Sequence, residues 1–443
     1  MTSAFDRMKD AYRKEYENNP VFTLFLTILI AFFIVFVIAA IVTGGDTFYY
    51  VLNSKKSMVF SDYFESVVSS YNNPYTNYHV VYPSMVTVFY AVIGHFTMPY
   101  VNIPASASLE ESFGLLRDSQ MGIMSFVLIT LVTFYVLHLI YIKIMKGTNL
   151  RKELMFLFLI LLSYPFIYAL ERGNSIILAL VFCFLFLLGH RSENKWIRYA
   201  SYIALGIAAG IKIYPAILWL LLIRDKQYRE AGICAAIVAA LFLIPFIFTD
   251  GNPIMLFDNA FTYAESNLGF TNIIQITGGL LHEILGFSAG IASVVGYTIL
   301  GLFTLLSFIV IVFDKEMKFW KILTLFGCNL VLGLGVGVQY QIIYMLPAML
   351  YFLAAEREMT KNNKFYVICF AMMLVLIPGI KFAISVSTDA GDFSYYPSAV
   401  IGAIETAFVI IVAIALLHEG LGRMYRNRFD RVSDSISRAE RQE

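Results

Sequence analysis

Long apolar runs separated by short polar segments make up most of this chain. A helix needs about 20 predominantly apolar residues to cross a bilayer, and fewer where protein shelters part of it. The pattern predicts about twelve membrane-spanning helices: 21–43, 119–142, 153–170, 175–190, 197–211, 214–224, 231–249, 287–313, 321–337, 341–355, 364–386 and 397–418. The short neighbours 197–211 and 214–224, and likewise 321–337 and 341–355, meet at polar breaks and could be broken helices. The predicted fold class is an all-α polytopic membrane protein, with 1–443 as a single membrane domain.

The positive charges decide the predicted topology. Segment 82–98 is apolar enough to be a further span. If it does not cross, most of the 32 Lys and Arg residues lie in loops on one side, whereas a crossing would move most of them to the other side. The positive-inside rule therefore favours a first external loop at 44–118 that carries a re-entrant or interfacial helix. Both termini are then cytoplasmic, with a cytoplasmic tail at 419–443.

Composition excludes several classes of protein. Hydrophobic residues make up 59% of the chain and charged residues 14%, against about 45–50% and 25% in soluble domains, so a water-soluble enzyme is excluded. A net charge of +1 gives no basic field for nucleic acid. The cysteines lie in apolar runs and the histidines show no ligand spacing, so we expect neither a metal nor a cofactor. The first apolar run lacks a cleavage site, so we expect a retained membrane anchor rather than a signal peptide. With its many apolar runs, the chain is expected to be a multi-pass protein of the cell membrane, namely a bacterial plasma membrane.

Unusual polar residues gather at the predicted external ends of the helices. They include the segments GGDTFYY (44–50), FSDYFESV (60–67), ERGNS (171–175), IKIYP (211–215) and VQYQ (338–341). An active site on this face is therefore expected. Because nucleotide-activated donors stay in the cytoplasm, a group transfer there would need a donor that crosses the membrane, and a lipid-linked donor fits.

Asp62 is the candidate general base. It follows an apolar run and precedes Tyr63 and Phe64, a setting that partly desolvates a carboxylate and brings it toward the range where it accepts a proton. The alternative is a solvated Asp that caps a helix starting near Tyr63. Asp46, at the outer end of the first span, is either a helix-end residue or a supporting second carboxylate.

Lys212 is the candidate phosphate ligand. It lies within the apolar stretch 201–224, where a cation costs about 2.5–3.5 kcal/mol unless it is paired or reaches the interface. Pro215 breaks the helix and would let the ammonium group face a polar cavity. An anionic phosphate is its natural partner, and the alternative is snorkelling to lipid headgroups.

Arg172 is a second cation on the same side. It precedes a span that starts near Ser175, so its guanidinium and the first amides of that helix could converge on a phosphate. Pairing with Glu171 or with a lipid headgroup is the alternative.

Further polar residues at helix ends could donate hydrogen bonds to sugar hydroxyls or accept them. They are Gln339 to Gln341, Tyr344, Asn267 and Asn272. The alternative is that each bonds to nearby backbone groups.

Several motifs occur in an order that resembles a known family. They are Ser61-Asp62-Tyr63-Phe64, Asn73-Pro74-Tyr75, Tyr82-Pro83, Arg172-Gly173-Asn174 and Ile211-Lys212-Ile213-Tyr214-Pro215. Together they resemble the GT-C membrane glycosyltransferases, especially glycosyltransferase family 87, over about residues 20–350. Two departures are Tyr82-Pro83-Ser84 in place of a double proline and Ser266-Asn267-Leu268-Gly269 in the middle external loop.

The resemblance implies an inverting enzyme of GT-C fold. It would move a sugar, mannose or another hexose or pentose, from a polyprenyl-phosphate donor to a lipid- or glycan-linked acceptor. Asp62 would be the base, and Lys212 and Arg172 would hold the donor phosphate. Substrate contacts would come from Asp46, Tyr63, Tyr75, Tyr82, Asn174, Tyr214, Asn267, Gln339 and Tyr340. The late-helix histidine of some relatives has no counterpart here, so no second acid or base is assigned.

Two other functions stay open at this point. Broken helices and an intramembrane Lys also suit a secondary transporter or a flippase of lipid-linked sugars. A polymerase or ligase of lipid-linked glycans would share the donor and the face, but it would transfer blocks rather than single sugars.

Overall fold

Helices form nearly all of the chain in the computed structural model, which describes residues 13, 16–52, 59–104, 106–266, 273–333, 339–379, 384–388, 391–395 and 397–439. The α-helices are α2 (Pro20–Val42), α3 (Asp46–Leu52), α4 (Ser61–Tyr71), α5 (Ser84–Thr97), α6 (Leu109–Asp118), α7 (Gln120–Ile144), α8 (Leu150–Phe156), α9 (Tyr164–Arg172), α10 (Ile176–Gly189), α11 (Lys195–Ile211), α12 (Leu220–Arg224), α13 (Tyr228–Leu243), α14 (Pro253–Ser266), α15 (Ile273–Gly278), α16 (Ala289–Phe313), α17 (Phe319–Leu332), α18 (Leu346–Ala355), α19 (Lys361–Met372) and α20 (Pro397–Ala439). Short 3-10 or π segments are η2 (Met98–Tyr100), η3 (Leu157–Leu161), η4 (Tyr214–Trp219), η5 (Ile244–Phe248), η6 (Gly279–Ile284) and η7 (Gln339–Met345). Two strands, β1 (Ile384–Thr388) and β2 (Gly391–Tyr395), complete the set.

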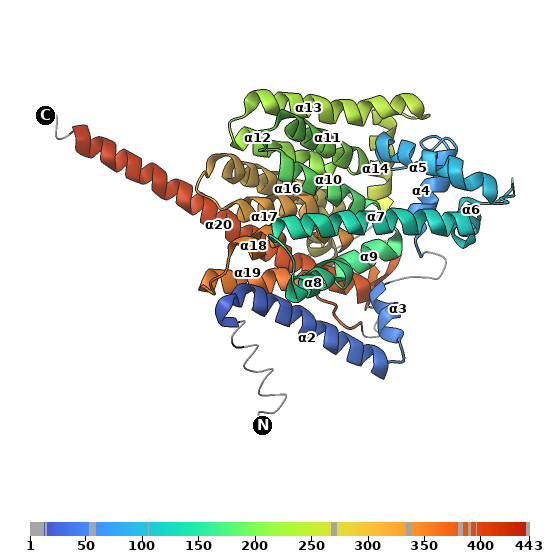
Figure 1. The fold of residues 1–443 in the computed structure, drawn as a ribbon, viewed down its shortest axis with the longest axis horizontal. Helices are drawn as coiled ribbons and strands as arrows, with labels where there is room; N and C mark the ends of the chain where they lie inside the picture. Colours follow the sequence, from blue (N-terminus) through green and yellow to red (C-terminus); the bar gives the residue numbers. More distant parts are fainter. Residues whose placement is uncertain are drawn as a thin grey trace.

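Five helices in the described part of the chain are long and apolar enough to span a membrane: Pro20–Val42, Gln120–Ile144, Tyr228–Phe248, Gly290–Phe313 and Ile401–Asn427. A sixth span is formed if Leu150–Leu161 and Tyr164–Arg172, which meet at 52°, are one broken helix. In Figure 1 the long helices α13, α7 and α2 run in roughly the same direction at the top, middle and bottom of the bundle, and the end of α20 projects from it. This is the helix set of a multi-pass membrane protein, with fewer long spans than the sequence predicted.

The structure has fewer long spans than predicted because several apolar runs are broken into shorter helices or end early. The predicted break after 197–211 is confirmed, because α11 ends at Ile211 and the next segment starts at Tyr214. The predicted helix over 364–386 is wrong in its second half. The helix α19 ends at Met372, Pro378 and Gly379 follow, and the chain then forms β1, which pairs antiparallel with β2. Proline and glycine disfavour helix, and the alternating Ile384 and Val386 of β1 favour a strand.

The helices α4, α5 and α6 form a small helical cap. Its own apolar core contains Phe64, Val67, Tyr90 and Phe113, and that core is completed by Phe126 of α7. The predicted non-spanning segment 82–98 is the 14-residue helix α5, whose Val92 and Phe96 are exposed. The cap lies at one end of the bundle, on the right in Figure 1.

Asp250 ties the loop between α4 and α5 to the end of η5. Its Oδ1 accepts from the Tyr75 N–H at 3.1 Å, and its Oδ2 accepts from the Thr76 N–H at 2.9 Å and from the Thr76 hydroxyl at 2.5 Å. Burial opposes ionisation, but these three hydrogen bonds prevail and hold the pKa of Asp250 below its usual value. The carboxylate therefore stabilises the loop in its charged form.

We expect Asp250→Asn to destabilise the fold by about 1–3 kcal/mol, because an amide group turns a donor toward backbone N–H groups that need an acceptor. Because the folded pKa is lowered, the contribution of Asp250 is present above the ordinary Asp pKa and is lost as pH falls through the folded value. Thermal unfolding of wild type and variant at pH 7 and at acidic pH measures both effects. The matched control is Asp258→Asn on the exposed face of α14; an equal loss there would contradict the assignment.

Candidate active site

Asp62 in the first turn of α4 forms a tight cluster with the turn between α9 and α10. Arg172 donates to Asp62 Oδ1 from Nη2 at 2.6 Å and from Nε at 3.1 Å. Asn174 donates to Asp62 Oδ2 from Nδ2 at 2.6 Å. The Asp62 side chain is 11% exposed, and a buried charge of this kind needs both an opposite charge and hydrogen bonds. The cluster therefore gathers three of the predicted site residues around one carboxylate.

Gly173 allows the cluster to form. It has φ +68°, and a Cβ there would lie 2.9 Å from Cβ of Tyr63 and 3.2 Å from the carbonyl oxygen of Phe60. Only glycine combines this left-handed turn with so close an approach to the start of α4. The turn therefore sets Arg172 and Asn174 on either side of Asp62.

The amide group of Asn174 is held at both ends. Its Oδ1 accepts from the Ile176 N–H at 3.0 Å, at the start of α10, while its Nδ2 donates to Asp62. The backbone bond satisfies one of the free N–H groups of a helix N-terminus. It also directs the donor end of the amide toward the carboxylate.

Lys212 lies beside Tyr82, next to this cluster. Its Nζ is 4.2 Å from the centroid of the Tyr82 ring, a cation–π contact. Within the described residues Lys212 has no carboxylate partner. Burial raises the pKa of the Tyr82 hydroxyl well above its ordinary value, and the charge of Asp62 raises it further. Tyr82 is therefore a neutral residue that contacts the cation and lies within range of the charge of Asp62.

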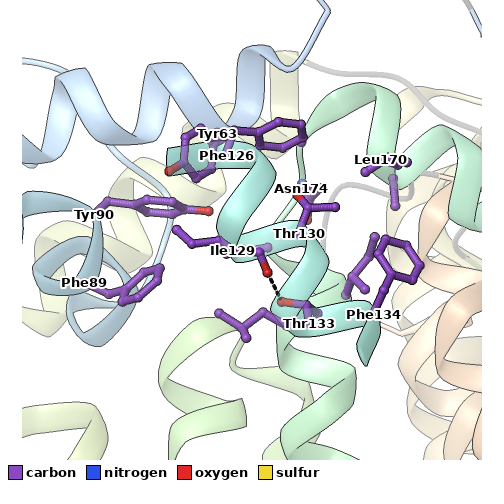
Figure 2. Close-up of a pocket in the computed structure, with 15 residues that line it drawn as sticks. Tyr63, Phe89, Tyr90, Phe126, Ile129, Thr130, Thr133, Phe134, Leu170 and Asn174 are labelled. Carbon is purple, nitrogen blue, oxygen red and sulfur yellow. Dashed lines mark hydrogen bonds between the residues drawn. The ribbon is translucent and has the colours of Figure 1, made fainter. Parts of the chain in front are cut away.

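An apolar groove runs to the cluster from the side of α5 and α7. Figure 2 shows its lining by residues of α4, α5, α7, α9 and the turn after α9: Tyr63, Phe89, Tyr90, Phe126, Ile129, Thr130, Thr133, Phe134, Leu170 and Asn174. The hydroxyl of Tyr63 donates to Ser125 Oγ at 3.0 Å, and its ring packs on Tyr90 and Phe126. Tyr63 thus presents a ring, rather than a free hydroxyl, to the groove.

Tyr75 is a buried packing residue rather than the substrate contact that the sequence suggested. It is 1% exposed, its hydroxyl donates to the Tyr82 carbonyl at 2.8 Å, and its ring packs on Phe246. A Cβ on Gly251 would lie 2.3 Å from this ring. Tyr75 therefore holds the backbone carbonyl of Tyr82 in place.

The remaining predicted substrate residues are spread more widely. Asp46 is exposed at the start of α3, and its side chain makes no hydrogen bond or ion pair with any described residue. Gln339 and Tyr340 begin η7, where the Tyr340 ring lies 6.3 Å from that of Tyr168, one helical turn before Arg172. Tyr214 begins η4 and packs against the main core. Asn267 lies outside the described residues.

Glu65 was not singled out from the sequence. It lies one turn after Asp62 on α4 and is exposed among buried neighbours. Although part of its surface is exposed, the neighbouring atoms displace water from the carboxyl group and raise the pKa of Glu65. The negative charge of Asp62 raises this pKa further, and the positive charge of Arg172 lowers it. The spacing of three residues on a helix could have revealed this pair of acids.

Glu405 was also missed. It lies inside the predicted span 397–418, is fully buried, and neither carboxyl oxygen has a hydrogen-bond partner in the described structure. A lone acid in an apolar run is the signal that could have found it.

A model of one known protein family matches this chain. The match is to glycosyltransferase family 87 and covers residues 100–332. The chain belongs to glycosyltransferase family 87. No curated protein and no solved structure matches it. The family membership confirms the resemblance, and the matched region contains Arg172, Asn174 and Lys212, whereas Asp62 precedes it.

We expect Gly173→Ala in this glycosyltransferase to lower both stability and activity. A left-handed backbone costs a residue with a Cβ about 1–2 kcal/mol, and the contact with Tyr63 adds to that cost. Thermal unfolding and sugar-transfer assays measure the two losses. Gly232→Ala on α13 is the matched control, because a Cβ there meets nothing within 4 Å. Equal effects of the two substitutions would contradict the close-packed turn.

Proposed function

We propose that this protein transfers a single sugar, mannose or another hexose or pentose, from a polyprenyl-phosphate donor to a hydroxyl group of a lipid- or glycan-linked acceptor. The observation that supports the proposal best is the Asp62 carboxylate held by Arg172 and Asn174, with the Lys212 ammonium packed against the Tyr82 ring and close enough to interact with the charge of Asp62. Membership of glycosyltransferase family 87 supports transfer rather than transport.

Asp62 acts as the general base in this proposal. The acceptor oxygen attacks the anomeric carbon while the bond from that carbon to the phosphate oxygen breaks. The acceptor proton passes to Asp62, the electron pair of the broken bond leaves with the phosphate, and the anomeric configuration is inverted. A phosphate leaving group needs no proton, so one carboxylate suffices where a glycoside hydrolase uses two.

Lys212 and Arg172 stabilise the departing phosphate. Positive groups placed where negative charge develops are among the largest contributions to catalysis. Arg172 commits Nε and one Nη2 hydrogen to Asp62, which leaves further N–H groups for a phosphate oxygen. The Lys212 ammonium lies against the Tyr82 ring and has no carboxylate partner among the described residues, so its charge is available to an anion.

The surroundings of the cluster suit lipid-linked substrates. The groove toward Asn174 is lined mainly by apolar residues, and the outward faces of α5 and α7 expose Phe89, Leu128 and Leu131. Hydrocarbon chains can approach such a face without crossing water. Tyr63, Tyr82 and Tyr340 offer ring faces to a sugar, and Asp46, Tyr214, Gln339 and Asn267 are the other proposed contributors.

The arrangement in the membrane completes the proposal. We place the helical cap and the Asp62 cluster on the external face of the cell membrane, with α5 as the re-entrant or interfacial helix of the 44–118 loop and both termini in the cytoplasm. The whole chain is a single membrane domain of GT-C fold with about twelve spans, short helices included. On that face a polyprenyl-phosphate sugar is a donor within reach.

We expect Asp62→Asn to lower turnover about 10²–10⁴-fold, because the near-isosteric amide cannot take the acceptor proton. The assay uses the full chain in detergent with a panel of polyprenyl-phosphate sugars and extracted membrane lipids as acceptors. Consumption of one donor by the wild type names the sugar, and the size of the product separates single-sugar transfer from block transfer. A folded Asp62→Asn variant with full activity would disprove the base assignment.

We expect Lys212→Met to lower kcat/KM for the donor about 100-fold, because an apolar chain of similar length removes the charge that holds the phosphate. The matched control is Lys361→Met, at the exposed start of α19. Thermal unfolding checks that both variants fold. Unchanged turnover in a folded Lys212→Met variant would remove Lys212 from the phosphate site.

A further inference from the structure

The hydrogen bonds around Asp62 leave one part of its carboxylate open. A carboxylate offers about four acceptor positions. Arg172 takes two on Oδ1 and Asn174 takes one on Oδ2. The remaining lone pair belongs to Oδ2, on the oxygen that Asn174 holds.

We infer that Asn174 is a positioning residue that acts through Asp62, by holding Oδ2 so that its remaining lone pair receives the proton of the acceptor hydroxyl. The inference rests on the proposed function, and it gives Asn174 a different role from the substrate contact that the family resemblance implied.

Burial and bonding of Asn174 support this role. The residue is only 4% exposed, whereas the Arg172 side chain is 27% exposed. Its acceptor oxygen bonds to the Ile176 N–H and one of its donor hydrogens points at Asp62. A side chain fixed in this way has little surface to offer a sugar, but it holds the carboxylate in one orientation.

The orientation of a base matters for rate. A misplacement of about 1 Å in a catalytic group can cost about 100-fold in turnover. The other titratable groups that interact with Asp62 are Arg172, Glu65, Lys212, Tyr82 and Tyr90. Of the described side chains that bond to the Asp62 carboxylate, Asn174 is the one without charge, so its substitution by Ala changes the geometry without altering the net charge of the site.

Two substitutions separate the bond to Asp62 from the bond to α10. Asn174→Asp keeps an oxygen for the Ile176 N–H but replaces the donor with a second acid, and two carboxyl groups in contact share a proton. Asn174→Ala loses both bonds. We expect both variants to lower kcat about 10–100-fold, with KM for donor and acceptor within about twofold of wild type. We also expect Asn174→Asp to move the acid limb of the pH profile of kcat to higher pH by about one unit or more.

The matched control is Asn194→Asp. Asn194 caps α11 by the same bond, its Oδ1 accepting from the Trp196 N–H at 2.9 Å, and it is exposed. We expect no change in kcat or in its pH profile for this variant. Thermal unfolding checks that both Asn174 variants fold.

The outcomes distinguish this inference from the proposed function. If Asp62→Asn is inactive but Asn174→Asp raises KM with an unchanged acid limb, Asn174 contacts a substrate and the positioning role is overturned. Wild-type kinetics in Asn174→Asp would overturn it as well. If Asp62→Asn is itself active, the base assignment fails, whatever Asn174 does.

Discussion

The bond between Asp62 and the turn after α9 is the interaction on which the rest of the site depends. It joins residues 110 positions apart in the chain and fixes the helical cap to the bundle. A carboxylate this well buried would be costly without a partner. Arg172 supplies the charge and Asn174 the additional hydrogen bond, and both can reach it only because Gly173 lets the turn approach α4.

Some of the site could be predicted because the signals are local. Asp62 after an apolar run, a lysine before Pro215 in an apolar stretch, and an Arg-Gly-Asn turn before a span can all be recognised from the sequence. The pairing of Asp62 with Arg172 could not, because Glu171 was an equally good partner by local spacing. The tertiary contact of α4 with α9 decides between them.

The number of spans and the role of Tyr75 likewise depend on tertiary contacts that the sequence does not reveal. Hydropathy predicted where apolar runs lie, and helices occupy most of them, but it could not show that the run over 364–386 ends its helix at Met372. Tyr75 was expected to contact a substrate, as aromatic residues of an external loop often do. Its hydrogen bond to the Tyr82 carbonyl and its packing on Phe246 depend on η5, which lies far along the chain.

The two cations near Asp62 differ in how they are held, and this difference suggests a division of labour. Arg172 is planar and forked, so it can orient a carboxylate and still present N–H groups to a phosphate. Lys212 is a compact charge against the Tyr82 ring, an arrangement that keeps an ammonium group in an apolar place without neutralising it. In the proposed reaction, a carboxylate partner for Lys212 would cancel the charge that stabilises the departing phosphate. The same site therefore requires one cation that is paired with the base and one that is not.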